Sequence, residues 1–291
     1  MTDVPGDRGA SGHYRILGDH TEAAPSGEQV LAEECAVAIS YNGINHAVMM
    51  ATPADLEDFA LGYSLTSGVI TGRDQLLDIR SRRISPQEHS PPTVMPDATE
   101  LELHLSLRAL HRYKQQRRAQ AGTSGCGVCG AEALEQAFPP LPDQPAGPYL
   151  LPPLSHLRDL RSRFQREQQK TNRSGAMHAA LYVDEHGHTR VCREDIGRHN
   201  ALDKLIGACM RNGVNPARGY FAITSRCSVE LVQKIARYGG GTLVSLASPT
   251  QLGVSWAQHF QINLIHLPSQ SPPRLYSPQP DSGPATSGPD R

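Results

Sequence analysis

Aromatic residues and long apolar runs are scarce in this sequence of 291 residues. Phe, Trp and Tyr make up 5% of it, and it contains one Trp. No apolar run approaches the ~20 residues of a membrane-spanning helix, so no membrane span is expected. A formal net charge of −1 gives no whole-chain field that would favour nucleic acid or a membrane surface as a partner. Residues 1–7 lack the basic and apolar regions of a signal peptide, which predicts that the protein stays in the cytoplasm.

Cysteine is also sparse, and its six residues are unevenly placed. Cys126 and Cys129 form a C-x-x-C pair inside the glycine-rich run 125–130, where glycine lets the backbone bend tightly. Because cytoplasmic thiols stay reduced, the pair indicates a reactive dithiol or half of a zinc site, with a structural pair as the alternative. The other cysteines supply no second pair for a closed zinc site, so no metal is expected. They are Cys35, Cys192, Cys209 and Cys227.

The residues on either side of this pair would favour the reactive thiolate. Residues 131–137 have the composition of a helix, and a helix that begins just after Cys129 would place partial positive charge near the sulfurs. A basic run lies upstream, although a solvated helix face is the commoner interpretation of such a run. Its members are Arg108, His111, Arg112, Lys114, Arg117 and Arg118.

Changes in composition and in hydrophobic pattern along the chain indicate two folded parts. Residues 1–27 are predicted to be a disordered tail, 28–138 an α+β domain that ends in the cysteine loop, and 139–153 a proline-rich linker. An α/β domain is predicted over 154–277 and a second disordered tail over 278–291. The predicted fold class is therefore α/β with an α+β N-terminal part.

The N-terminal part begins with a hairpin signal. Asn42-Gly43 suits a type I′ turn and predicts a hairpin between strands 35–40 and 46–50. Thr52 is expected to cap a helix that ends near Gly68. Two further strands are predicted, at 77–84 and, from strictly alternating leucines, at 101–107.

The C-terminal part alternates strands and helices. After a hairpin over 179–192, Asn200 is expected to cap a helix whose buried face includes Cys209. The β and α segments that follow predict a parallel sheet with right-handed crossovers. The predicted strands are 220–223, 242–246 and 262–267, and the predicted helices are 229–238 and 251–260.

Polar residues gather where these strands end. In parallel α/β sheets, ligands bind beyond the carboxyl ends of the strands. Ser225 and Arg226 suit a phosphate, whereas N-capping by Ser228 and Ser248 would explain the serines but not the arginine. The turn 194–200 packs four ionisable groups just before a helix and could hold a polar ligand. The three strand ends are 224–228, 247–250 and 267–272.

Taken together, these stretches resemble the FdhD family of formate dehydrogenase accessory sulfurtransferases, from about residue 33 to residue 267. The run 194–207, E-D-I-G-R-H-N-A-L-D-K-L-I-G, is specific enough to carry the resemblance almost alone. The other matching runs are Tyr41-Asn42-Gly43, Thr52 to Gly62, Ser124 to Gly130, His178-Ala179-Ala180 and Thr224 to Ser228.

The resemblance implies a sulfur carrier. Such proteins receive sulfur from a cysteine desulfurase as a persulfide. They pass it to the molybdenum of the bis(molybdopterin guanine dinucleotide) cofactor, which then enters formate dehydrogenase. The resemblance assigns catalysis to Cys126, which would carry the sulfur, and to Cys129. It also implies a C-terminal three-layer domain like that of the cytidine deaminases, and a homodimer.

The cofactor would be a bound substrate, recognised through its GDP or GMP moiety. Relatives usually have Phe and a basic, Gly-containing stretch after the last strand, and the loss of both here predicts weaker guanine stacking and phosphate pairing. Two alternatives are an accessory chaperone, which holds the cofactor or apo-formate dehydrogenase without moving sulfur, and a zinc-stabilised binding module. The predicted cofactor-binding residues are Arg198, Ser225, Arg226, Leu267, Pro268, Ser269, Gln270, Ser271 and Pro272.

Overall fold

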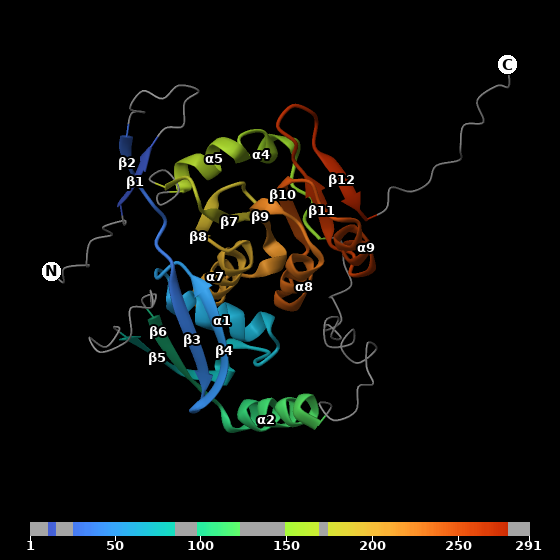
Figure 1. The fold of residues 1–291 in the computed structure, drawn as a ribbon. Helices are drawn as coiled ribbons and strands as arrows, with labels where there is room; N and C mark the ends of the chain where they lie inside the picture. The colour runs from blue at the N-terminus through green and yellow to red at the C-terminus, as the bar shows by residue number, and fades with distance from the viewer. Residues whose placement is uncertain (1–10, 16–25, 85–97, 123–148, 169–173, 279–291) are drawn as a thin grey trace, which may run out of the picture.

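The structure is a computed structural model that describes residues 11–15, 26–84, 98–122, 149–168 and 174–278. Within these residues there are sheets of two, four and six strands (Figure 1). The smallest sheet pairs β1 (Ser11–Arg15) with β2 (Ser26–Val30). The structure therefore differs from the prediction of a disordered segment 1–27, since residues 11–15 form a strand.

The Asn42-Gly43 hairpin is confirmed. β3 (Cys35–Tyr41) and β4 (Ile44–Ala51) pair antiparallel. Both turn residues have positive φ, 47° at Asn42 and 75° at Gly43, as a type I′ turn requires.

Two more strands complete the N-terminal sheet, in the order β4-β3-β6-β5. β6 (Ala98–Leu105) runs parallel to β3 and antiparallel to β5 (Leu76–Ile84). The alternating leucines of β6 are confirmed as its buried face, because Leu101, Leu103 and Leu105 are all buried. The predicted strand 101–107 is too long, because Leu107 is exposed and begins the next helix.

The first helix begins later than predicted. α1 is Leu56–Thr66, and its N-cap residue Asp55 has a φ of 55° and makes no side-chain capping bond. The predicted Thr52 cap is wrong, because the Thr52 hydroxyl accepts a hydrogen bond from the Ile196 amide instead (3.2 Å). α2 (Leu107–Gly122) follows β6 and carries the basic run.

Six strands form the C-terminal sheet, in the order β12-β11-β10-β9-β7-β8. The predicted hairpin is confirmed as β7 and β8. The prediction of a parallel sheet is confirmed only for β9, β10 and β11. β7 runs antiparallel to β8 and β9, and the unpredicted strand β12 runs antiparallel to β11, so the sheet is mixed. The bounds are β7 His178–Asp184, β8 Thr189–Asp195, β9 Gly219–Arg226, β10 Thr242–Ala247, β11 Asn263–His266 and β12 Arg274–Ser277.

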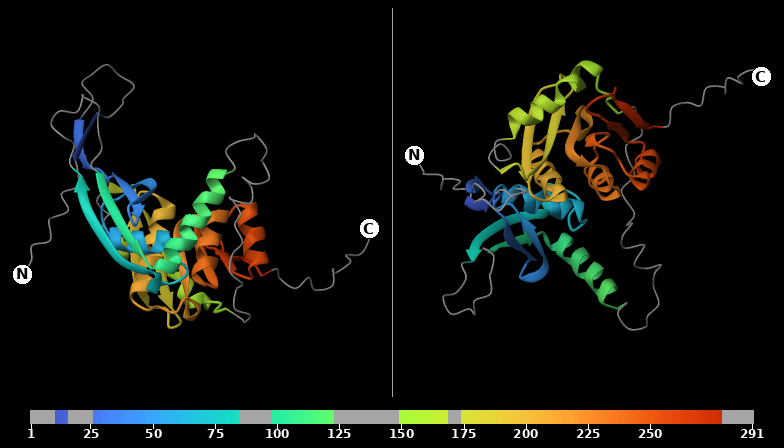
Figure 2. Two further views of the ribbon diagram at one scale, coloured as in Figure 1. Left: turned by 90° about the horizontal axis from the view of Figure 1, so that it is seen from below. Right: turned by 45° about the horizontal axis from the view of Figure 1, so that its top comes forward.

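Helices cover both faces of this sheet, as Figure 2 shows. α4 and α5 pack on one face through Leu157, Leu160 and Phe164, and α7, α8 and α9 lie on the other. The predicted cap at Asn200 is wrong, because Gly197 is the N-cap of α7 and Asn200 lies in its first turn. The bounds are α4 Leu154–Arg158, α5 Leu160–Glu167, α7 Arg198–Arg211, α8 Val229–Tyr238 and α9 Gln251–His259, with short 3₁₀ helices η1 Arg73–Gln75 and η2 Pro216–Arg218.

α1 and α7 join the two large sheets. A Cβ atom at Gly62 would lie 1.8 Å from the Asp203 carbonyl oxygen, and one at Gly207 would lie 1.9 Å from the Asp58 carbonyl oxygen. The two backbones therefore touch, and a single hydrophobic core contains residues of both sheets. The predicted domain boundaries stay a prediction.

Candidate functional site

The carboxyl ends of several strands meet at one edge of the C-terminal sheet. β8 runs in the same direction as β9, since β7 is antiparallel to both, and β9, β10 and β11 are parallel. Ala247 pairs with Arg226, and Ser245 pairs with His266. This row of strand ends, from β8 to β11 together with the start of β12, is called the strand edge below. The predicted cofactor-binding residues lie along it, as the sequence argument expected, and their role stays a prediction.

The end of β9 contains two of these residues. Arg226 is the last residue of the strand and is exposed, whereas Ser225 is buried and its hydroxyl donates to the Arg226 carbonyl (3.2 Å). Ser228 is the N-cap residue of α8, but its side chain makes no capping bond. α9 is capped by Thr250, whose hydroxyl accepts from the Gly253 amide (3.1 Å), and not by Ser248. Side-chain capping therefore does not explain either serine.

Asp195 and Asn200 of the turn 194–200 hold the turn to the N-terminal part, through the Thr52 amide and the Met50 carbonyl. Asp195 and Lys204 are fully buried and form an ion pair of 2.6 Å. Asp195 also accepts from the Thr52 and Gly197 amides (3.0 and 2.8 Å) and from the Asn200 side chain (3.0 Å). Lys204 donates to the Thr52 carbonyl (2.9 Å). Thr52 and Lys204 were not among the predicted site residues, and this cluster leaves no free group for a ligand at Asp195.

Arg198 and His199 of the same turn are oriented differently. Each is half-buried, and neither the Arg198 Nε nor the His199 Nε2 has a hydrogen-bond partner among the described residues. Burial lowers the pKa of His199, and the nearby charges of Lys234 and Arg198 lower it further, with Glu230 and Asp203 opposing. Burial and Arg198 likewise lower the pKa of His178, at the start of β7. This end of the strand edge therefore combines a guanidinium with two neutral imidazoles, which suits an anion.

The segment Leu267 to Pro272 lies at the other end of the strand edge. The Leu267 amide donates to the Ser245 carbonyl (2.9 Å), and Leu267 is buried. Ser269, Gln270 and Pro272 are exposed. The Leu267 carbonyl accepts from an Arg161 Nη2 that also reaches the Leu246 carbonyl (2.5 and 2.9 Å). Arg161 was not among the predicted residues, because nothing in its local sequence distinguishes it.

Cys126, Cys129 and the predicted helix 131–137 lie outside the described residues. The described cysteines are free, and three of them have strongly disfavoured thiolates. Burial raises the pKa of Cys192, Cys209 and Cys227 to about 12 in each case. Cys209 is a core residue, as predicted.

The basic run upstream of the cysteines is divided between structural and exposed roles in α2. Arg112 donates to the Val69 carbonyl and the Gln75 side chain (3.0 and 2.8 Å). Arg117 donates to the Asn45 carbonyl (2.7 Å) and lies 6.0 Å from the centre of the Tyr113 ring. The rest of the run with described side chains is exposed, namely Arg108, His111 and Lys114.

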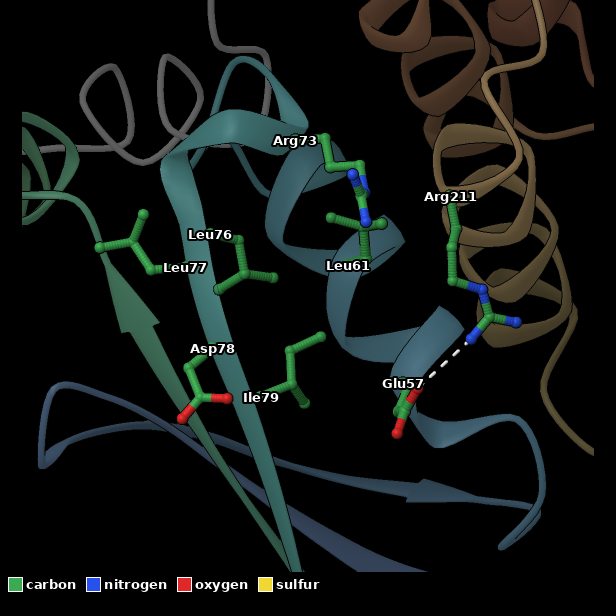
Figure 3. Close-up of a pocket in the computed structure, with 8 residues that line it drawn as sticks. All are labelled: Glu57, Leu61, Arg73, Leu76, Leu77, Asp78, Ile79 and Arg211. Atoms are coloured by element: carbon green, nitrogen blue, oxygen red, sulfur yellow. Dashed lines mark hydrogen bonds and ion pairs between the residues drawn. The ribbon is translucent and has the colours of Figure 1, made fainter.

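A separate pocket of about 260 Å³ lies between α1 and β5 (Figure 3). Leu61, Leu76 and Ile79 are among its apolar residues, and on its rim Arg211 pairs with Glu57 (3.3 Å). Arg211 ends α7, whereas Arg198 begins it, and a helix of 14 residues spans about 20 Å. The pocket is therefore at the opposite end of α7 from the strand edge, and no predicted site residue lines it.

Among the described residues, no group of three or more His, Cys, Asp or Glu side chains could hold a metal ion. No helix among them is both long and apolar enough to cross a membrane.

Comparison with known proteins gives consistent matches over most of the chain. The model of the FdhD/NarQ family matches residues 32–281. The sulfur carrier protein FdhD of Bordetella petrii is 38% identical over 265 residues, 90% of each chain. That of Cupriavidus necator is 41% identical over 238 residues, 80% of this chain and 77% of its own. A crystal structure described as a putative formate dehydrogenase accessory protein from Desulfotalea psychrophila has the same fold, with a TM-score of 0.68 at 19% identity over 92% of this chain and 96% of that one.

Proposed function

The chain belongs to the FdhD/NarQ family, and from this membership we propose that it is a cytoplasmic sulfur carrier that serves formate dehydrogenase. It takes persulfide sulfur from a cysteine desulfurase and delivers it to the molybdenum of the bis(molybdopterin guanine dinucleotide) cofactor. The C-terminal three-layer part is of the cytidine deaminase type, and the working form is a homodimer. Helices on both faces of the C-terminal sheet support the first of these two points.

Cys126 is the sulfur carrier in this proposal. Its thiolate attacks the outer sulfur of the desulfurase persulfide, the S–S bond of that persulfide breaks, and the desulfurase cysteine leaves as a thiolate. The product is a persulfide on Cys126, with Cys129 as the neighbouring thiol. The raised pKa of Cys192, Cys209 and Cys227 supports this choice, since a thiol with a pKa of about 12 is almost wholly protonated near neutral pH.

The strand edge binds the cofactor as substrate, through its guanine nucleotide. The observation that carries this step is the placement of Arg198, Arg226 and Leu267 along one edge of the C-terminal sheet, at the ends of β8, β9 and β11. Ser225 and the segment from Pro268 through Ser269, Gln270 and Ser271 to Pro272 line the same edge. Exposed guanidinium groups and helix N-termini are the groups that proteins use to bind phosphate.

Mass spectrometry of the intact protein tests sulfur transfer directly. After incubation with a cysteine desulfurase and cysteine, the wild-type chain is expected to gain a sulfur atom that a thiol reductant removes. Cys126→Ala is expected to gain none and to abolish formate dehydrogenase maturation. The matched variant Cys129→Ala retains the proposed sulfur acceptor, Cys126, and is expected to lose less of the ability to mature formate dehydrogenase.

The same experiment separates the alternatives. If the wild-type chain gains no sulfur yet still supports maturation, the protein is an accessory chaperone and not a sulfur carrier. Full maturation by Cys126→Ala would end the sulfur-carrier proposal. About one tightly bound zinc per chain, found without added metal, would favour a zinc-stabilised module.

A further inference from the structure

We propose that the pocket between α1 and β5 binds an extended, acidic segment of a partner protein. The segment pairs with the side of β5 that faces away from β6, called the β5 flank below, and places an apolar side chain in the pocket. This inference goes beyond the sulfur-carrier proposal, because the pocket lies at the opposite end of α7 from the strand edge and no residue assigned to that proposal lines it.

The β5 flank offers backbone groups to a further strand. Within the described residues, β5 ends the four-stranded sheet and pairs with β6 alone. The strand is nine residues long, and an edge strand of this length presents a row of amide and carbonyl groups to another chain. An extended peptide is the class of ligand that binds by completing such a sheet.

The pocket adjoins this flank on the side of α1 (Figure 3). Leu76 and Ile79 of β5 are half-buried and pack against the core, and the buried Leu61 of α1 lies across from them. A strand added at the β5 flank would lie about 4.8 Å from β5, and every second side chain would point to the same face as Ile79. The cavity of about 260 Å³ is therefore where an apolar side chain of the added strand would lie.

A bulge in β5 extends the apolar surface out of the pocket. The register of β5 and β6 shifts between Leu76 and Asp78, and the intervening Leu77 lines the pocket with 67% of its surface exposed. A single exposed leucine is ordinary, but this one continues an apolar pocket beside a free strand. It adds contact area for the same partner segment.

The charges on the pocket rim leave one cation for a ligand. Glu57 is paired with Arg211 (3.3 Å), and Asp78 is paired with Arg80 (2.9 Å). Arg73 is exposed, lines the pocket, and forms no hydrogen bond or ion pair with another described side chain. Its guanidinium points toward Leu61 in Figure 3. A carboxylate next to the bound apolar side chain would supply the acceptor that Arg73 lacks.

Charge also decides between a partner protein and a second copy of this chain. Residues 73–84 contain four arginines and two aspartates. The same strand of a second copy would place mainly like charges opposite one another, which destabilises strand pairing. An acidic segment of a different protein complements the excess of arginine.

Fluorescence anisotropy of a labelled peptide, E-V-E-L-E-V-E, titrated with the full chain tests this inference. Its apolar side chains share one face, and a glutamate at each end can reach Arg73 whichever way the peptide runs. We expect saturable binding of this peptide. The lysine counterpart K-V-K-L-K-V-K, and the acidic peptide with alternate amides N-methylated, are expected to bind at least tenfold more weakly, because one lacks the charge and the other lacks the backbone donors.

Two substitutions at exposed residues test the pocket without disturbing the core. Arg73→Glu is expected to weaken binding of the acidic peptide roughly tenfold, because an attraction is replaced by a repulsion. Leu77→Ser is expected to weaken it roughly threefold to tenfold through lost apolar contact. The matched control is Arg166→Ala, an exposed arginine of α5 on the far face of the other sheet, and it is expected to bind as the wild type does.

Three outcomes would overturn the inference. The first is a wild-type chain that does not bind the acidic peptide, or that binds it no more tightly than Arg73→Glu and Leu77→Ser do at equal melting temperature. The second is equal binding of the N-methylated peptide, which would show that no strand is added. The third is a change of oligomeric state in Leu77→Ser by sedimentation, which would show that a second copy covers the pocket. Persulfide formation on Cys126 is measured without the peptide, so the sulfur-carrier proposal stands or falls separately.

Discussion

Asp195 and Lys204 form the most deeply buried ion pair among the described side chains. Both have no exposed side-chain surface, and they lie 2.6 Å apart. Taking two charges out of water is costly, and only further hydrogen bonds offset the cost. Here Thr52, Gly197 and Asn200 supply those bonds, so the pair joins a strand end of one sheet to the loop after β4 of the other.

Removal of one partner at this place leaves an unpaired buried charge. Lys204→Met is therefore expected to lower the free energy of unfolding by about 3–5 kcal/mol, measured by urea denaturation. The exposed pair Arg218–Glu185 is the control, and Arg218→Met is expected to cost less than about 1 kcal/mol. A Lys204→Met chain as stable as the Arg218→Met chain would show that the ion pair contributes nothing to the joint.

At the scale of elements, the crossing of α1 and α7 depends on two residues without side chains. The nearest atoms to a Cβ at Gly62 or Gly207 belong to the backbone of the other helix, which no rotamer change can move. Glycine in a helix interior costs about 1 kcal/mol relative to alanine, so its presence in both helices is explained by the close approach and not by helix propensity.

Alanine at either position is thus expected to destabilise the protein despite its better helix propensity. Gly62→Ala and Gly207→Ala should each lower the melting temperature in a thermal scan, because the helices must separate. Gly253→Ala in α9 is the control: its nearest atoms lie at 3.1 Å, so a shift of a few tenths of an ångström accommodates the methyl group. An unchanged or raised melting temperature in Gly207→Ala would contradict the packing described.

At the scale of the whole molecule, the two sheets share one hydrophobic core. Val37 and Leu103 of the N-terminal sheet belong to the same buried cluster as Leu205 of α7 and Leu243 of β10. Because the core is shared, unfolding of either part would expose apolar residues of the other, which favours cooperative unfolding.

The chain is therefore expected to unfold in one transition. Fluorescence of Trp256, the one tryptophan, reports on α9, and far-ultraviolet circular dichroism reports on all elements. The two urea curves should coincide in the wild type. Separate midpoints, or hydrogen exchange that releases β3 and β6 well before β9 and β10, would show two independent units.

Several features were determined by the sequence alone, because they depend on neighbours in the chain. Positive φ at Asn42 and Gly43 follows from the residue types, and the alternation of Leu101 and Leu103 follows from the two-residue period of a strand. The C-x-x-C pair and the run 194–207 likewise indicated the family, which the comparison confirmed. The candidate edge was predicted in the same way, since parallel strands place their ends together.

Other features were decided only by the tertiary structure. Thr52 and Asn200 are residue types that commonly cap helices. Here each side chain instead bonds to a residue about 150 positions away in the sequence, and the helices begin elsewhere. Arg161 reaches Leu267 across 106 residues. Local propensity amounts to about 1 kcal/mol per residue, less than a buried ion pair or an unpaired buried polar group costs, so the long-range contact prevails over the local preference.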